Sequence, residues 1–162
     1  MHILAPILLY GLLLSVLFAA MILAMALVNP RFMLQDYPKD IQAAVPPKTA
    51  AEKRQTLYWG LPIWVFLLGC PSLAALSVKA ANGGFLELFV AAFGVLFLSN
   101  LVDWLILDWL IFCTITPTFV VLPGTEGMAG YKNYRMHFGG FLIGTVLAIL
   151  IGLIISAIFV FL

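Results

Sequence analysis

Residues 138–162 read FGGFLIGTVLAILIGLIISAIFVFL, and none of these side chains is charged. A helix of roughly 20 apolar residues is long enough to cross the hydrocarbon core of a bilayer. Three further segments are comparably apolar, so the sequence predicts membrane spans at about 3–28, 57–78, 85–107 and 138–162. The runs are continuous, whereas the strands of a membrane β-barrel alternate in segments of about ten residues. We therefore expect an all-α, polytopic membrane protein, a four-transmembrane-helix bundle forming a single membrane domain over residues 1–162.

The composition supports the same class. Hydrophobic residues make up 64% of the chain, charged residues only 9%, and the formal net charge is +1. Such values are far from those of soluble globular domains. No basic stripe or nucleic-acid motif is present, so we expect no nucleic-acid partner, and membrane lipids are the first partners that the composition indicates.

The orientation follows from the basic residues. Seven of the eight lie in the connections 29–56 and 108–137: Arg31, Lys39, Lys48, Lys53, Arg54, Lys132 and Arg135. Only Lys79 lies on the opposite side. The positive-inside rule places both connections in the cytoplasm and both termini outside. We therefore expect an integral, multi-pass protein of the bacterial cytoplasmic (inner) membrane, with these basic residues acting as topology determinants and lipid contacts.

The first connection also contains a helix-start signal. Thr49 and Glu52 have the spacing of a capping box, in which each side chain binds the other residue's backbone N–H. The second long helix is therefore predicted to begin near Ala50, ahead of its membrane entry.

The last span carries a stripe of small residues at every fourth position: Gly140, Gly144, Ala148, Gly152 and Ser156. Such a stripe lets two membrane helices approach closely. The first span has a shorter version: Gly11, Ser15 and Ala19. We expect these two stripes to pack antiparallel within one monomer. A homo-oligomer contact is the alternative use of the same stripe.

The third span ends in polar residues. Asn100, Asp103 and Asp108 follow an otherwise apolar run, and ionisable groups near hydrocarbon are rare and usually functional. On a continuous α-helix Asn100 and Asp103 are neighbours, whereas Asp103 and Asp108 point about 140° apart. We therefore expect the two carboxylates not to share one helix face.

A second polar group lies at the same predicted cytoplasmic side, after a turn at Pro123-Gly124: Glu126, Lys132, Arg135 and His137. Lys132 and Arg135 could neutralise the two aspartates, and His137 is expected to face a neighbouring helix. The predicted binding site therefore comprises Asn100, Asp103, Asp108, Glu126, Arg135 and His137.

Three functions compete for this cluster. The leading prediction is binding or translocation of a small ion or lipid headgroup. The alternatives are an intramembrane lipid-modifying enzyme that uses carboxylate and histidine acid–base chemistry, and a non-catalytic assembly subunit of a larger membrane complex. The spacing of the carboxylates matches no metal motif, and Cys70 and Cys113 form no CxxC pair.

Overall fold

The computed structural model describes residues 2–162, and its architecture is the all-α membrane bundle that the sequence predicts. Four long helical segments are apolar enough to cross a membrane. Their elements are α1 Leu4–Val28, α3 Ala50–Ala80, α4 Phe85–Val102 with its direct continuation η2 Asp103–Ile115, and α5 Tyr134–Phe161. Shorter elements lie in the connections: η1 Pro30–Asp36, α2 Lys39–Ala44, η3 Thr118–Val120 and η4 Ala129–Lys132.

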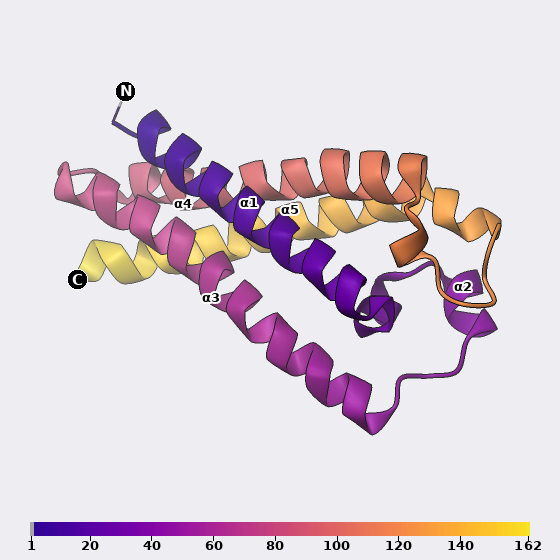
Figure 1. Ribbon diagram of the computed structural model, residues 1–162. Coiled ribbons are helices and arrows are strands. Elements are labelled where there is room, and N and C mark those ends of the chain that lie inside the picture. The colour runs from indigo at the N-terminus through magenta and orange to yellow at the C-terminus, as the bar shows by residue number, and fades with distance from the viewer. Residues whose placement is uncertain (1) are drawn as a thin grey trace.

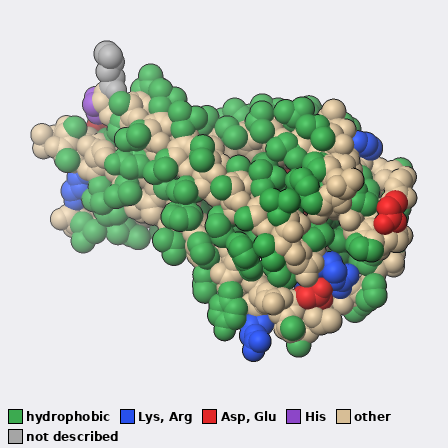
Figure 2. All heavy atoms as spheres, in the orientation of Figure 1, with side chains coloured by type: hydrophobic (Ala, Val, Ile, Leu, Met, Phe, Trp, Pro, Cys, Tyr) green, Lys and Arg blue, Asp and Glu red, His purple; other side chains and the backbone are tan. Residues whose placement is uncertain are grey.

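The two ends of the bundle differ. Both chain termini lie at one end, at the left of Figure 1, whereas α2 and the long connections lie at the other end. The view in Figure 2 shows hydrophobic side chains over most of the length and charged side chains toward the two ends. This pattern is that of a protein whose middle faces lipid and whose ends face water.

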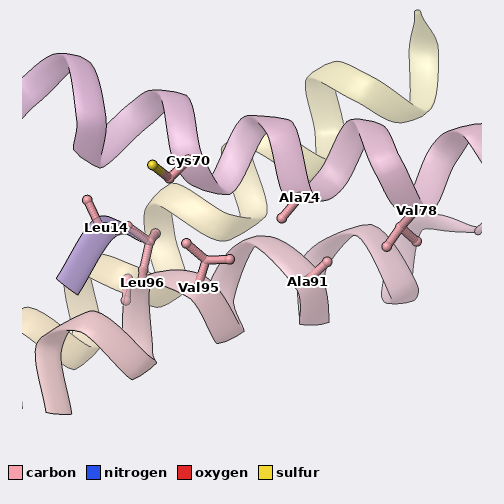
Figure 3. Packing of buried hydrophobic residues seen from close by; sticks show 8 residues of the cluster. Leu14, Cys70, Ala74, Val78, Ala91, Val95 and Leu96 are labelled. Carbon is pink, nitrogen blue, oxygen red and sulfur yellow. The ribbon is translucent and has the colours of Figure 1, made fainter. Parts of the chain in front are cut away.

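The core of the bundle is built from small side chains on α3 and α4. Ala74 and Val78 of α3 point toward the helix that carries Ala91 and Val95, and all four are fully buried (Figure 3). Leu14 of α1 joins the same cluster. Lipid tails are as apolar as the core, so the hydrophobic effect does not drive membrane helices together. Close van der Waals packing stabilises their contacts instead. Small residues therefore place α4 at the centre of the bundle.

The pairing expected between the stripes of α1 and α5 is wrong. Each stripe packs against α4, which lies between the two helices. A Cβ added to Gly11 of α1 would lie 2.8 Å from Leu98 of α4, and one added to Gly152 of α5 would lie 3.3 Å from Phe93. The grooves of small residues are filled by the large side chains of α4 and not by each other.

The connections at the α2 end fold into a small apolar layer that we call the cap, residues 30–44 and 117–132. Its buried side chains share contacts across the two connections: Phe32, Met33, Leu34, Ile41, Val120, Leu122 and Tyr131. The Tyr37 hydroxyl donates to the Val120 carbonyl at 2.8 Å, and the Leu122 N–H donates to the Tyr131 hydroxyl at 2.9 Å. The cap thus covers one end of the bundle as an ordered structure.

The predicted start of the second long helix is confirmed. The Glu52 N–H donates to the Thr49 hydroxyl at 3.2 Å, and the Thr49 N–H donates to the Glu52 carboxylate at 2.7 Å. Arg31 of η1 forms an ion pair with the same carboxylate, 2.6 Å from Nε to Oε1. The capping box therefore also ties the cap to α3.

Candidate functional site

The third long helix changes its geometry where it becomes polar. Phe85–Val102 is α-helical, and Asp103–Ile115 is a π-helix. A π-helix is wider because each N–H bonds the carbonyl five residues earlier, and such segments occur frequently at functional sites. The Thr116 N–H accordingly donates to the Ile111 carbonyl at 2.8 Å, and the Thr114 hydroxyl donates to the Trp109 carbonyl at 2.7 Å. Thr116 ends the segment with a left-handed φ of 49°.

The π-helix brings residues five apart to the same side. Trp104 and Trp109 illustrate this, since their ring centroids are 4.7 Å apart. Asp103, Asp108 and Cys113 have the same spacing. The expectation that the two aspartates point in different directions is therefore wrong, because it assumed an α-helix. Both aspartates line one pocket.

This pocket has a volume of about 690 Å³ and lies between η2, α5, the C-terminal half of α1 and the cap. Its polar lining comes from several elements: Gln35, Asp36, Lys39, Gln42, Asn100, Asp103, Asp108 and His137. Its apolar lining includes Phe18 and Ile22 of α1, Trp104 and Phe112 of η2, and Phe141 and Ile143 of α5. The pocket therefore joins an apolar region within the bundle to polar side chains on α4, η2, α5 and the cap.

Asp108 is paired with His137. The distance from Asp108 Oδ1 to His137 Nδ1 is 2.9 Å, and both side chains are mostly buried. Asn133 fixes the start of α5, because its side chain accepts from the Met136 N–H at 3.0 Å. His137, which follows Met136 in α5, faces η2. Cys113 also contacts the His137 ring, but it is fully buried and does not line the pocket.

Asn100 and Asp103 have different environments. The Asn100 amide donates to the Phe141 carbonyl at 3.0 Å and to the Thr145 hydroxyl at 3.2 Å, so it ties α4 to α5. Asp103 is partly buried and lines the pocket. Within residues 2–162 its carboxylate has no ion pair and accepts no hydrogen bond, although Asp108, His137 and Asp36 lie within electrostatic reach.

The cap contributes a carboxylate that the sequence did not single out. The Gln35 amide donates to Asp36 Oδ2 at 2.7 Å. Asp36 is an exposed residue. Desolvation by the surrounding protein nevertheless raises the pKa of its carboxyl above the ordinary value of 3.8, and the Gln35 hydrogen bond and the Lys48 charge oppose this. Lys39 also lines the pocket, and the sequence does not single it out as a site residue either. A charged residue in a short connection carries no sequence signal that separates a pocket wall from a solvated loop.

Two residues of the predicted site lie elsewhere. Glu126 is exposed and accepts from the Gly124 N–H at 3.1 Å within its own turn. Arg135 is exposed and forms no ion pair in the described part of the chain. Side chains two positions apart on an α-helix differ in direction by about 200°. Arg135 therefore faces away from η2 when His137 faces it.

The expected neutralisation of the aspartates by Lys132 and Arg135 is therefore wrong. Lys132 donates instead to the Thr114 carbonyl at 2.9 Å and to the Thr116 hydroxyl at 2.7 Å, where it satisfies a free acceptor at the end of η2. His137 is the basic group that meets Asp108.

The unpaired polar groups of the site are mainly carboxylate oxygens, together with the buried indole N–H of Trp104. Across residues 2–162 no group of three or more histidine, cysteine, aspartate or glutamate side chains is arranged to hold a metal ion. Three carboxylates line the pocket with one histidine and one lysine. Comparison with protein-family models, curated proteins and solved structures finds no match to this chain.

Proposed function

We propose that this protein binds the cationic headgroup of a membrane amphiphile in the pocket between η2, α5 and the cap. The observation that carries the proposal is the state of the three carboxylates. Asp108 is paired with His137 and Asp36 accepts from Gln35, whereas Asp103 has no partner among the described residues. A partly buried, unpaired carboxylate is costly unless a cation or donor meets it. A bound cation would supply that partner.

The apolar lining supports an amphiphile over a small ion. Phe18, Phe141 and Ile143 continue the pocket away from the carboxylates, and Ile143 is 65% exposed on the outer surface of α5. A side chain in this place contacts lipid when the bundle lies in a bilayer. An acyl chain can therefore lie along this surface while its headgroup reaches Asp103.

The charge distribution supports a location in the inner leaflet. The cap and the adjoining helix ends carry Arg31, Lys39, Lys48, Lys53, Arg54, Lys132 and Arg135, and the opposite end carries Lys79. By the positive-inside rule the cap would face the cytoplasm, in a bacterial cytoplasmic membrane, and the pocket would open near the cytoplasmic headgroup layer. This orientation is part of the proposal.

Native mass spectrometry of the protein in a mild non-ionic detergent tests the proposal. The probes are dodecylamine, dodecanol and butylamine, which separate charge from chain length. We expect one dodecylamine per chain to be retained at least about tenfold better than dodecanol, because a charged hydrogen bond exceeds a neutral one. Asp103→Asn should remove this preference.

Glu126→Gln is the matched control, since it removes an exposed carboxylate outside the pocket. It should bind dodecylamine as the parent protein does. Equal retention of dodecanol and dodecylamine, unaffected by Asp103→Asn, would contradict the proposal. Equal retention of butylamine and dodecylamine would replace the amphiphile with a small cation.

A lipid-modifying enzyme is the second candidate, and the contact of His137 with Asp108 favours it. A histidine held by a carboxylate 2.9 Å away is a candidate general base or acid within the pocket. Incubation with a phospholipid mixture and mass spectrometry of the products separate the two functions. A chemical change of the lipid that His137→Gln abolishes would favour the enzyme, whereas retention of intact lipid by both proteins would favour binding alone.

A further inference from the structure

We infer that the headgroup bound in the pocket is a zwitterion in which an ammonium group that carries N–H bonds is joined to a phosphate, as in an ethanolamine phospholipid. This inference rests on the proposed function and adds the chemical class of the ligand. It follows from which donors and acceptors of the pocket are already used within the protein.

Most of the unused polar groups on η2 and η1 that line the pocket are acceptors; the exception is the buried indole N–H of Trp104, a donor without a partner among the described residues. Asp108 uses Oδ1 for His137, and Asp36 uses Oδ2 for Gln35. Their second oxygens and both oxygens of Asp103 have no partner among residues 2–162. An ionised carboxylate only accepts hydrogen bonds, and a primary ammonium group offers three donors. A quaternary ammonium group offers none and would leave these oxygens unsatisfied at a cost.

The donors on the cap are mostly occupied. The Gln42 amide donates to the Tyr37 carbonyl at 2.5 Å and to the Gln35 carbonyl at 3.1 Å. The Tyr37 hydroxyl donates to the Val120 carbonyl. These groups hold the cap together and are not free to bind a ligand.

Lys39 is the exception among these donors. It is exposed, lines the pocket, and its ammonium group has one long contact, 3.5 Å to the Gln42 amide oxygen. It can therefore meet an anionic group of the ligand. The carboxylates belong to η2 and the end of η1, whereas Lys39 begins α2. A ligand with both charges, close together in one headgroup, satisfies both parts of this wall.

The experiment compares phospholipids that differ only in the methylation of the amine. Phosphatidylethanolamine, its N,N-dimethyl derivative and phosphatidylcholine, all with oleoyl chains, are added in equal amounts to the protein in mild detergent, and bound lipid is counted by native mass spectrometry. We expect retention to fall with each loss of N–H donors, and phosphatidylethanolamine to exceed phosphatidylcholine at least about tenfold. Equal or better retention of phosphatidylcholine would overturn the inference.

Variants separate the two charges of the headgroup. Lys39→Gln should weaken phosphatidylethanolamine binding several-fold and should not weaken dodecylamine binding, because only the phospholipid carries a phosphate and the lost charge repels the amine. Lys53→Gln is the control, since Lys53 belongs to the same end of the molecule but does not line this pocket. Unchanged phosphatidylethanolamine binding in Lys39→Gln would overturn the phosphate contact.

The inference and the proposed function fail in different ways. If dodecylamine binds and needs Asp103 but the phospholipids show no preference for N–H donors, the inference is wrong and the proposed function stands. If neither dodecylamine nor any phospholipid depends on Asp103, both are wrong. Water-soluble glycerophosphoethanolamine gives the last comparison: binding as strong as that of the lipid would support the headgroup chemistry and overturn the membrane source.

Discussion

The two halves of the third membrane helix are built on different hydrogen-bonding patterns, although the chain runs through them without a break. The α-helical half, Phe85–Val102, is surrounded by α1, α3 and α5 and buries a face of small and aliphatic side chains. The π-helical half, Asp103–Ile115, buries only Leu107 and Cys113, and it is covered by α5 and the cap. The first half holds the bundle together, and the second holds the pocket.

The difference explains why the polar residues lie where they do. The α-helical half packs closely against its neighbours, and only Asn100, near its end, lines the pocket. The wider π-helix brings Asp103 and Asp108 to one side and turns them toward a pocket that tight helix packing would fill. π-Helices are rare and frequently lie at functional sites. We therefore expect changes in the α-helical half to affect mainly stability and changes around η2 to affect ligand binding.

The largest effect is expected where α5 meets the end of the α-helical half. A Cβ at Gly144 would collide with the Asn100 amide, whereas one at Gly140 would meet no other group within 4 Å. Gly144→Leu should lower the stability by about 3 kcal/mol, the upper part of the range for overpacking. Thermal unfolding in detergent measures the change. The control Gly140→Leu belongs to the same stripe and should unfold nearly as the parent protein does.

Equal unfolding temperatures for the two glycine variants would contradict the assignment of the stripe to α4. A loss of stability in Gly140→Leu alone would instead indicate a contact between two copies of the chain, because this position has open space within the monomer.

A smaller effect is expected in the cap. Tyr131→Phe removes the acceptor of the buried Leu122 N–H and the partner of the Thr125 hydroxyl. An unsatisfied buried donor costs about 1–3 kcal/mol. Because the cap forms one wall of the pocket, dodecylamine binding should weaken as well. Tyr134→Phe is the control, since the Tyr134 hydroxyl bonds Thr114 at an exposed position and its loss should change stability by less than about 1 kcal/mol.

The smallest effect concerns pH. Desolvation raises the pKa of Asp36 above 3.8, so its neutral form is favoured in the folded protein. The stability that this protonated form contributes is fully present when the pH is below the pKa of Asp36 in the unfolded chain. It is lost as the pH rises through the raised pKa of Asp36 in the folded protein. The affinity for a cation depends on pH in the opposite direction and increases as the pH rises, because the cation binds the ionised carboxylate. Dodecylamine affinity should therefore fall as the pH is lowered from neutral toward the raised pKa.

Other ionisable groups lie near Asp36: Asp103 and Asp108 of η2, His137 of α5 and Lys48 beside the cap. The test is therefore the difference between the parent protein and Asp36→Asn. A shallower pH profile in the variant, measured by native mass spectrometry across the acidic range, is the expected result. Parallel profiles would show that Asp36 does not contact the ligand.

The sequence was sufficient for features that depend on local chemistry. Long apolar runs such as 138–162 predict helices because the bilayer fixes their length. The capping box of Thr49 and Glu52 predicts a helix start because both hydrogen bonds lie within one turn. Which helices pack against each other depends on residues that are far apart in the sequence, and the sequence patterns did not predict it. The small residues of α1 and α5 were recognised, but Leu98 and Phe93 of α4 decide what fills their grooves.

The candidate site was predicted in part for the same reason. The sequence indicates Asp103, Asp108 and His137 because ionisable side chains near hydrocarbon are costly and usually functional. Their alignment depends on a π-helix, and no residue pattern in Asp103–Ile115 separates it from an α-helix. Arg135 is wrongly predicted because the direction of its side chain depends on the rotation of α5, which the sequence does not give. The sequence does not indicate Asp36, because only the folding of the cap brings it to the pocket.

The most direct test of the π-helix places the same pair of histidines in both halves of the helix. Leu105→His with Leu110→His puts two ligands five residues apart in η2, and Phe85→His with Val90→His does so in α4; all four positions are exposed. Two histidines on one side of a helix chelate Ni²⁺, whereas residues five apart on an α-helix point about 140° away from each other.

Calorimetric titration with Ni²⁺, in a His2→Gln background, compares each pair with its single-histidine variants. We expect the η2 pair to bind at least about tenfold more tightly than its single variants, and the α4 pair to show no such gain. If the two pairs behave alike and neither exceeds its single variants, η2 is an ordinary α-helix, and the shared pocket of Asp103 and Asp108 does not exist.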